Sequence, residues 1–121
     1  MQNTDEQSIN SRIVKILEEG TRTFDRHMGM QLTASGPGNV TYRMIVPDNF
    51  ITMSGAAHGG AVAALMDATL GMTATSCSLA NNRMCSTVEF KINYLSPVNP
   101  GDILIASANV DHKGKSLMVV N

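Results

Sequence analysis

The apolar and polar residues between positions 30 and 47 alternate as they do in strands with one buried face. In VTYRMIV the apolar positions are every second residue, namely Val40, Tyr42, Met44 and Val46. The turn-rich segment SGPGN separates this run from MQLTA, and Pro47 follows it directly. These features predict a β-hairpin whose second strand ends at Pro47.

A second alternating run, RMCSTVEFKINYL at residues 83–95, predicts another strand. The apolar residues of its predicted inner face are Val88, Phe90, Ile92 and Tyr94. After the turn SPVNPG, the segments DILIASANVDH and SLMVV predict two further strands joined by the tight connection KGK. The sequence stops at Asn121 within this last apolar strand. We therefore expect either an unusually short protein or a partner chain that completes the sheet edge.

Two other runs have the spacing of helices. Thr4 and Gln7 are placed as a capping box, and the apolar residues that follow predict a short amphipathic helix at about residues 4–19. Residues 59–78 are apolar in nearly every direction around a helix axis, which is typical of a buried helix. The order of elements predicts a single α+β domain at residues 1–121, with an antiparallel sheet and a long helix.

The composition excludes several classes of protein. The chain has 121 residues, of which 43% are hydrophobic and 16% charged, as in one globular domain. A net charge of −1 and an aromatic content of 4% do not supply the basic surface and stacking residues of a nucleic-acid-binding protein. The N-terminus resembles no secretion signal and no run is long enough to span a membrane. We therefore expect a cytoplasmic protein with neither nucleic acid nor membrane as a partner.

The cysteines and histidines predict neither a disulfide nor a metal site. Cys77 and Cys85 could pair, but reduced thiols are favoured in a chain without a secretion signal. His27, His58 and His112 are far apart and have no close His or Cys neighbours.

One carboxylate, Asp67, lies inside the apolar run of residues 59–78. The residues three and four positions away on a helix leave space beside it; they are Ala63, Ala64, Leu70 and Gly71. Burying an unpaired carboxylate is costly, so we expect Asp67 to be paired, to have a raised pKa or to face a cleft. A hydrogen bond to the backbone of a neighbouring loop explains the residue equally well.

Gly59 and Gly60 allow two interpretations. They form a simple tight turn, or they leave the first N–H groups of the helix open to a carbonyl oxygen that gains negative charge. Such a carbonyl needs a base or nucleophile, and Asp67 is the only buried candidate. His58 and Asp67 are nine residues apart, and so about 13 to 14 Å along a helix axis and on opposite sides of it. If both act on one atom, a second copy must supply Asp67, which predicts a symmetric dimer with two composite sites.

In these residues the chain resembles the hot-dog-fold acyl-CoA thioesterases, in particular the PaaI-like group of the phenylacetate pathway. The resemblance rests on GAAHGGAVAALMD at residues 55–67, TVEFKINYLSP at 87–97, PGD at 100–102 and HKGKS at 112–116. It implies an antiparallel sheet wrapped around the central helix, and folds paired edge to edge as a homodimer or a dimer of dimers. It also implies a hydrolase that cleaves acyl- or arylacyl-CoA without a metal or other cofactor.

The resemblance also implies roles for single residues. The Gly59 N–H would polarise the thioester carbonyl beside Gly60, and His58 would hold the thioester or the glycine turn. Asp67 of the partner subunit would activate water, or attack directly to form an anhydride. Thr87, where relatives have Ser or Thr, would help to position the water.

Several other residues are candidates for substrate binding. Relatives commonly carry Asn where this chain has Thr52, and the nearest Asn is Asn49. Met66 adjoins the carboxylate and could touch the acyl group. The basic residues that could meet the phosphates of coenzyme A, if they are not simply solvated loop charges, are Arg83, Lys113 and Lys115.

Two alternatives to thioester hydrolysis are compatible with the same fold. A non-catalytic acyl-CoA sensor would bind its ligand tightly without turnover. An enoyl-CoA hydratase would use an Asp and a His close together on one loop, whereas here their order and spacing differ.

Overall fold

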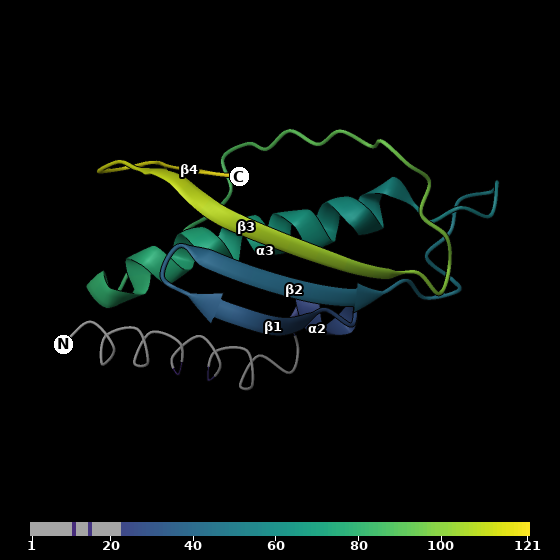
Figure 1. The fold of residues 1–121 in the computed structure, drawn as a ribbon, viewed down its shortest axis with the longest axis horizontal. Helices are drawn as coiled ribbons and strands as arrows, with labels where there is room; N and C mark the ends of the chain where they lie inside the picture. The colour runs from purple at the N-terminus through teal and green to yellow at the C-terminus, as the bar shows by residue number, and fades with distance from the viewer. Residues whose placement is uncertain (1–10, 12–14, 16–22) are drawn as a thin grey trace.

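The computed structural model describes residues 11, 15 and 23–121, so the predicted helix at about residues 4–19 lies outside the described residues apart from Ser11 and Lys15. The described chain forms an antiparallel sheet with one long helix packed along its face (Figure 1). In chain order the elements are α2 (Phe24–His27), β1 (Gln31–Gly36), β2 (Asn39–Ile45), α3 (Gly59–Ser78), the 3₁₀ turn η1 (Leu79–Asn81), β3 (Ile103–Lys113) and β4 (Met118–Val120).

The sheet has the order β1-β2-β3-β4, and each neighbouring pair is antiparallel. The predicted hairpin is confirmed as β1 and β2, with its turn at Pro37 and Gly38. Strands β2 and β3 pair in a regular register that runs from Asn39 opposite Asn109 to Ile45 opposite Ile103. The connection from β3 to β4 is a tight turn, closed by a 2.8 Å hydrogen bond from the Gly114 N–H to the Leu117 carbonyl.

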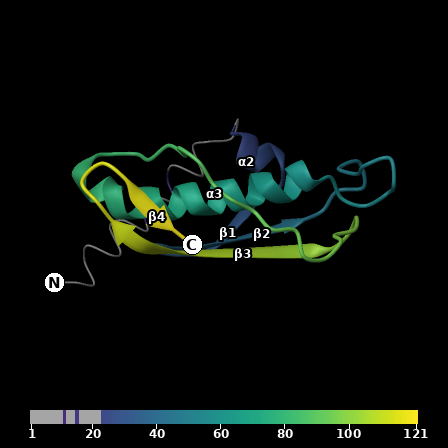
Figure 2. The ribbon, with the colours of Figure 1, turned by 90° about the horizontal axis from the view of Figure 1, so that it is seen from above.

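Helix α3 has the bounds that the sequence predicts, and its inner face forms the core with β2. The core residues shared by the helix, the sheet and the segment before β1 are Met28, Met30, Val40, Tyr42, Met44, Ala61 and Leu65. Leu65 is 2% exposed and Met44 is 0% exposed, and each such burial contributes roughly 1.5–3 kcal/mol. Seen from above, α3 lies between the sheet and α2 (Figure 2).

The C-terminal half of α3 buries hydroxyl groups as well as apolar side chains. Thr69, Thr73 and Ser76 each donate to a helix carbonyl three or four residues earlier, at 2.6 to 2.7 Å. The hydroxyl of Ser76 also accepts the N–H of Gly38 at 2.8 Å. These bonds satisfy the buried hydroxyls and join the β1–β2 turn to the helix.

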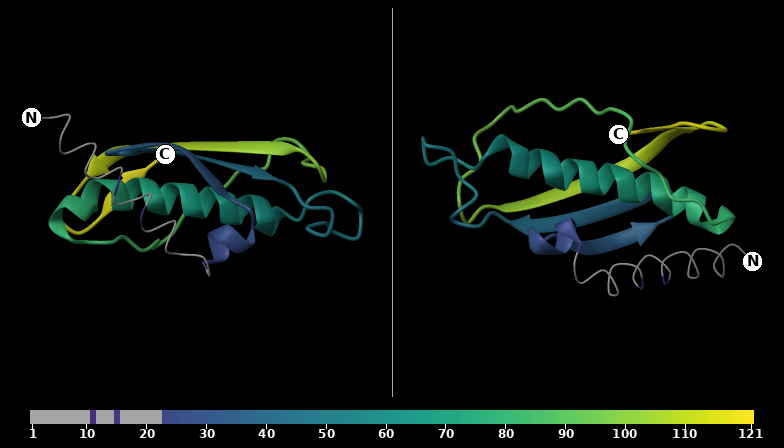
Figure 3. Two further views of the ribbon diagram at one scale, coloured as in Figure 1. Left: turned by 90° about the horizontal axis from the view of Figure 1, so that it is seen from below. Right: turned by 180° about the vertical axis from the view of Figure 1, so that it is seen from behind.

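The strand predicted at residues 83–95 is wrong. This segment has no strand pairing in the structure and follows an open path along the side of the molecule across from β1 (Figures 1 and 3). Its predicted inner face is not buried, since Val88 is 80% exposed and Tyr94 is 55% exposed. Alternation predicts that a segment can pair, but a ladder also needs a neighbouring strand, and the described residues provide none along this segment.

Candidate active site

The N-terminus of α3 is capped by the residue before it. His58 has an extended backbone (φ −63°, ψ 130°), and its Nδ1 accepts the N–H of Gly60 at 2.8 Å. Its carbonyl accepts the N–H of Ala61 at 2.9 Å. No hydrogen bond within the described residues uses the N–H of Gly59. Of the two glycines expected to offer open N–H groups, Gly59 does so, whereas the N–H of Gly60 is occupied by the cap.

Tyr94 lies over this end of the helix. Its hydroxyl donates to the carbonyl of Gly59 at 2.8 Å, and a Cβ at position 59 would come within 3.4 Å of the ring. That distance is an ordinary van der Waals contact, so the Tyr94 ring packs directly against the first turn of α3. The sequence gives no signal for the contact, because the alternation around Tyr94 predicts packing in a sheet.

Asp67, in the middle of α3, is paired with a side chain and not with loop backbone. The hydroxyl of Thr87 donates to Asp67 Oδ1 at 2.6 Å. Asp67 and its neighbour Met66 are half-buried, not fully buried as expected, because they lie on a part of α3 that the sheet does not cover. Oδ2 of Asp67 has no hydrogen bond within the described residues. The carboxylate is therefore held through one oxygen and open at the other.

A second carboxylate, Asp25 in α2, lies close enough to Asp67 for their charges to interact. Burial, and then the negative charge of Asp67, raise the pKa of Asp25 above its ordinary value. Burial, followed by the charge of Asp25, likewise raises the pKa of Tyr42. The Tyr42 hydroxyl is buried and has no hydrogen-bond partner among the described residues. Sequence patterns do not connect these residues, which meet only because α2, α3 and β2 pack together.

The loop before α3 places Thr52 and Asn49 differently. The hydroxyl of Thr52 lies 2.7 Å from Ser54 Oγ and 3.3 Å from the Ala56 carbonyl. Thr52 is thus engaged within its own turn. Asn49 instead lines a pocket that His58 also borders.

The three candidate cations lie toward the other end of α3. Lys113 Nζ donates to the carbonyl of Cys77 in the last turn of the helix at 3.0 Å. Arg83 follows η1 closely, and Lys115 lies in the turn after β3. Because α3 has 20 residues, it is about 30 Å long. The fold of one chain does not bring these cations to Gly59.

In the residues that the structure describes, no three His, Cys, Asp or Glu side chains gather as metal ligands. Nor does any helix of that part have the length and apolar character needed to cross a bilayer. What α3 presents is an open N–H and a carboxylate held by a hydroxyl, which are groups that acyl transfer can use.

Comparison with protein sequences gives a consistent result. A model of the thioesterase superfamily matches residues 54–121, which include α3, β3 and β4. Acyl-coenzyme A thioesterase 13 of Homo sapiens is 32% identical over 97 residues, which cover 79% of this chain and 68% of the human protein.

Solved structures share the fold over most of the chain. The PaaI protein of the Escherichia coli phenylacetic acid degradation operon superposes with a TM-score of 0.79 at 19% identity, covering 93% of this chain and 88% of its own. Protein PA5202 of Pseudomonas aeruginosa superposes with a TM-score of 0.74 at 32% identity, covering 81% of this chain and 77% of its own. With the sequence matches, these similarities show that the chain belongs to the thioesterase superfamily and is a thioester hydrolase with the hot-dog fold.

Proposed function

We propose that the protein hydrolyses acyl-CoA to a free acid and coenzyme A, with Asp67 as the catalytic carboxylate and the Gly59 N–H as the carbonyl donor. The observation that carries the proposal is the 2.6 Å hydrogen bond from Thr87 to Asp67 on an open part of α3. Thr87 fixes one carboxylate oxygen and leaves the other to accept a proton. Similarity to acyl-coenzyme A thioesterase 13 supports acyl-CoA as the substrate class.

The proposed chemistry uses water and no cofactor. The Gly59 N–H, at the positive end of the α3 dipole, stabilises the oxygen of the tetrahedral intermediate. Asp67 accepts a proton from the attacking water, whose oxygen bonds to the carbonyl carbon. The C–S bond then breaks, and coenzyme A leaves with its electron pair as the thiolate. Direct attack by Asp67, followed by hydrolysis of the resulting anhydride, gives the same products.

One chain does not supply both groups to the same carbonyl. Gly59 and Asp67 are eight residues apart in one helix, which separates them by about 12 Å along its axis. The reacting atoms must come within roughly 3–3.5 Å of their catalytic groups. We therefore propose a homodimer in which Asp67 of one protomer acts with Gly59 of the partner subunit.

The same dimer gives the distant cations a role. Arg83, Lys113 and Lys115 lie toward the end of α3 opposite Gly59 in their own chain. Two-fold packing that sets the two α3 helices antiparallel would bring these cations toward the glycines of the second copy. The phosphates of coenzyme A, which the pantetheine arm holds away from the thioester, would meet these cations beyond the glycines.

Release of free thiol from a panel of acyl-CoA esters tests the proposal, with wild type compared with Asp67→Asn. Asn keeps the shape of Asp and can still accept from Thr87, but it cannot take a proton from water. We expect kcat to fall by about 10²-fold or more while thermal unfolding stays close to that of wild type. Asp111→Asn, at an exposed position of β3, is the matched control and should keep wild-type activity.

The outcomes of this experiment separate the alternatives. Wild type that binds the esters in calorimetry without releasing thiol would show a binding protein in place of a hydrolase. Hydrolysis that persists at the wild-type rate in Asp67→Asn would remove Asp67 from the chemistry and keep the thioesterase assignment.

A further inference from the structure

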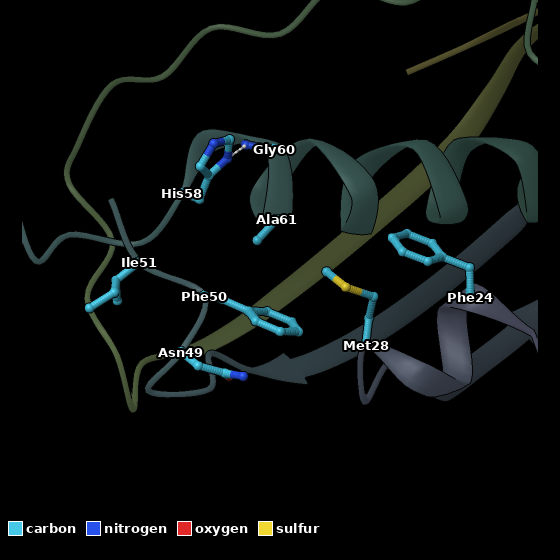
Figure 4. Close-up of a pocket in the computed structure, with 8 residues that line it drawn as sticks. All are labelled: Phe24, Met28, Asn49, Phe50, Ile51, His58, Gly60 and Ala61. Carbon is cyan, nitrogen blue, oxygen red and sulfur yellow. Dashed lines mark hydrogen bonds between the residues drawn. The ribbon is translucent and has the colours of Figure 1, made fainter. Parts of the chain in front are cut away.

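A pocket of about 330 Å³ lies between α2, the loop before α3 and the first turn of α3. The residues that line it are Phe24, Met28, Asn49, Phe50, Ile51, His58, Gly60 and Ala61. The side chains of Met28, Phe50 and Ala61 converge on it from three different segments (Figure 4). The pocket is therefore built by elements that only the folded chain brings together.

The floor of this pocket belongs to the core, whereas its rim is exposed. Met28 and Ala61 are 8% and 7% exposed and belong to the core cluster. Phe24 is 60% exposed and Ile51 is 42% exposed. The Ile51 side chain points away from the other lining residues, whereas the Phe24 ring faces them (Figure 4). Phe24 therefore leaves apolar surface in water that an apolar ligand in the pocket would cover.

The pocket adjoins the proposed carbonyl site. His58 and Gly60, the two chain neighbours of Gly59, both line it. An acyl chain whose carbonyl oxygen accepts the Gly59 N–H therefore begins at the edge of this pocket. The lining contains no Asp, Glu, Lys or Arg side chain that could pair with a charged acyl group.

On the basis of the proposed function, we infer that this pocket holds the acyl group of the thioester and that Phe24 limits its length. A cavity of about 150 Å³ can hold one benzene ring, so a pocket of about 330 Å³ has room for a medium-length acyl chain or one aromatic ring. The preferred acyl group is uncharged, and is either of medium length or carries one aromatic ring. Longer chains leave apolar carbons in water and gain nothing from their extra length.

The test is kcat/KM for a series of straight-chain acyl-CoA esters from about four to about sixteen carbons, together with phenylacetyl-CoA. For wild type we expect kcat/KM to rise with chain length and to level off within the series, once the chain is longer than the pocket. Phe24→Ala opens the rim and should move this plateau to longer chains. Phe24→Trp narrows the pocket and should lower kcat/KM for the longer esters by about tenfold, with little change for the shortest.

Two further variants guard against indirect effects. Phe50→Trp enlarges a side chain that points into the pocket from the loop (Figure 4) and should reproduce the effect of Phe24→Trp, even if substitution at Phe24 shifts α2. Ile105→Ala removes an equally apolar side chain, 70% exposed on β3 and away from the pocket, and should leave the length profile unchanged.

The failure of this inference can be told from the failure of the proposed function. If wild type hydrolyses the series and the Phe24 and Phe50 variants change kcat/KM by the same factor at every length, the pocket assignment is overturned and hydrolysis stands. If wild type hydrolyses none of the esters, both are overturned. Asp67→Asn, assayed on the same series, should lose activity at every length, which separates catalysis from length selection.

Discussion

At the scale of single residues, Asp67, Asp25 and Tyr42 share one electrostatic environment although they are far apart in the chain. Asp67 accepts the hydrogen bond of the Thr87 hydroxyl through one of its carboxylate oxygens. Asp25 has two unfavourable influences, burial and the charge of Asp67, and both raise its pKa. An ionised Asp25 therefore lowers the free energy of unfolding and adds negative potential beside the proposed catalytic carboxylate.

We predict that Asp25→Asn stabilises the protein at neutral pH but not in acid. The unfolded chain loses the Asp25 proton near pH 3.8, and the folded chain holds it to higher pH. Above pH 3.8 the folded state thus binds more protons than the unfolded state, so stability falls as pH rises through the folded pKa. Thermal unfolding of wild type and variant at about pH 7 and about pH 3.5 measures the difference. An equal gain at both values would contradict the electrostatic origin.

At the scale of elements, we predict that Gly59→Pro and Gly59→Ala differ in activity. Proline removes the N–H but is tolerated at the first position of a helix, and the extended backbone of His58 suits the residue before a proline. Alanine keeps the N–H and brings its Cβ to 3.4 Å from Tyr94. We expect kcat for thioester hydrolysis to fall about 10²- to 10³-fold in Gly59→Pro and less than about tenfold in Gly59→Ala. Equal losses in both would indicate crowding by Tyr94 and not a lost donor.

The turn between β1 and β2 supports a second prediction at this scale. Gly38 has φ +77°, and a Cβ there would lie 3.2 Å from Cys77 Sγ on α3. Gly29 has a similar φ of +79°, but nothing lies within 4 Å of its Cβ position. We expect Gly29→Ala to lower the free energy of unfolding in urea by about 1 kcal/mol and Gly38→Ala by about 2 kcal/mol. Equal losses would mean that Cys77 moves aside without cost.

Local patterns predicted the elements that are formed by local contacts. The β1–β2 hairpin and the bounds of α3 follow from alternation, from turn residues and from apolar periodicity. The segment at residues 83–95 was predicted wrongly, since its alternation does not say which strand it pairs with. Pairing depends on distant parts of the chain, which sequence spacing does not reveal.

The candidate site was predictable to a similar extent. The glycine turn marks the start of α3, and the lone carboxylate in an apolar run marks Asp67. Resemblance to a known family, and not spacing, suggested that Thr87 acts with Asp67. Tyr94, Asp25 and the rim residue Phe24 were missed because each acts through a contact between separate elements.

At the scale of the whole molecule, a single chain exposes an apolar surface and holds its two proposed catalytic groups too far apart to act together. Val88, Tyr94 and Leu95, in the segment that pairs with no strand, are 80%, 55% and 91% exposed. The two proposed catalytic groups are held about 12 Å apart by the rigid geometry of α3. We propose that a second copy packs along residues 83–95, where it covers this surface and completes the two sites.

The composite site predicts that two inactive variants restore each other. Asp67→Asn and Gly59→Pro each spoil both sites of a homodimer, but a mixed dimer keeps one site in which both groups are intact. Random reassortment of equal amounts makes about half of the dimers mixed, so about a quarter of the wild-type activity should return. Thiol release from an acyl-CoA ester, measured after the variants are unfolded and refolded together, checks this. Mixing Gly59→Pro with a chain that carries both substitutions should restore nothing, because every site then lacks the Gly59 N–H. If the first mixture also stays inactive while the proteins refold, Asp67 and Gly59 do not combine across two chains and the shared site is wrong.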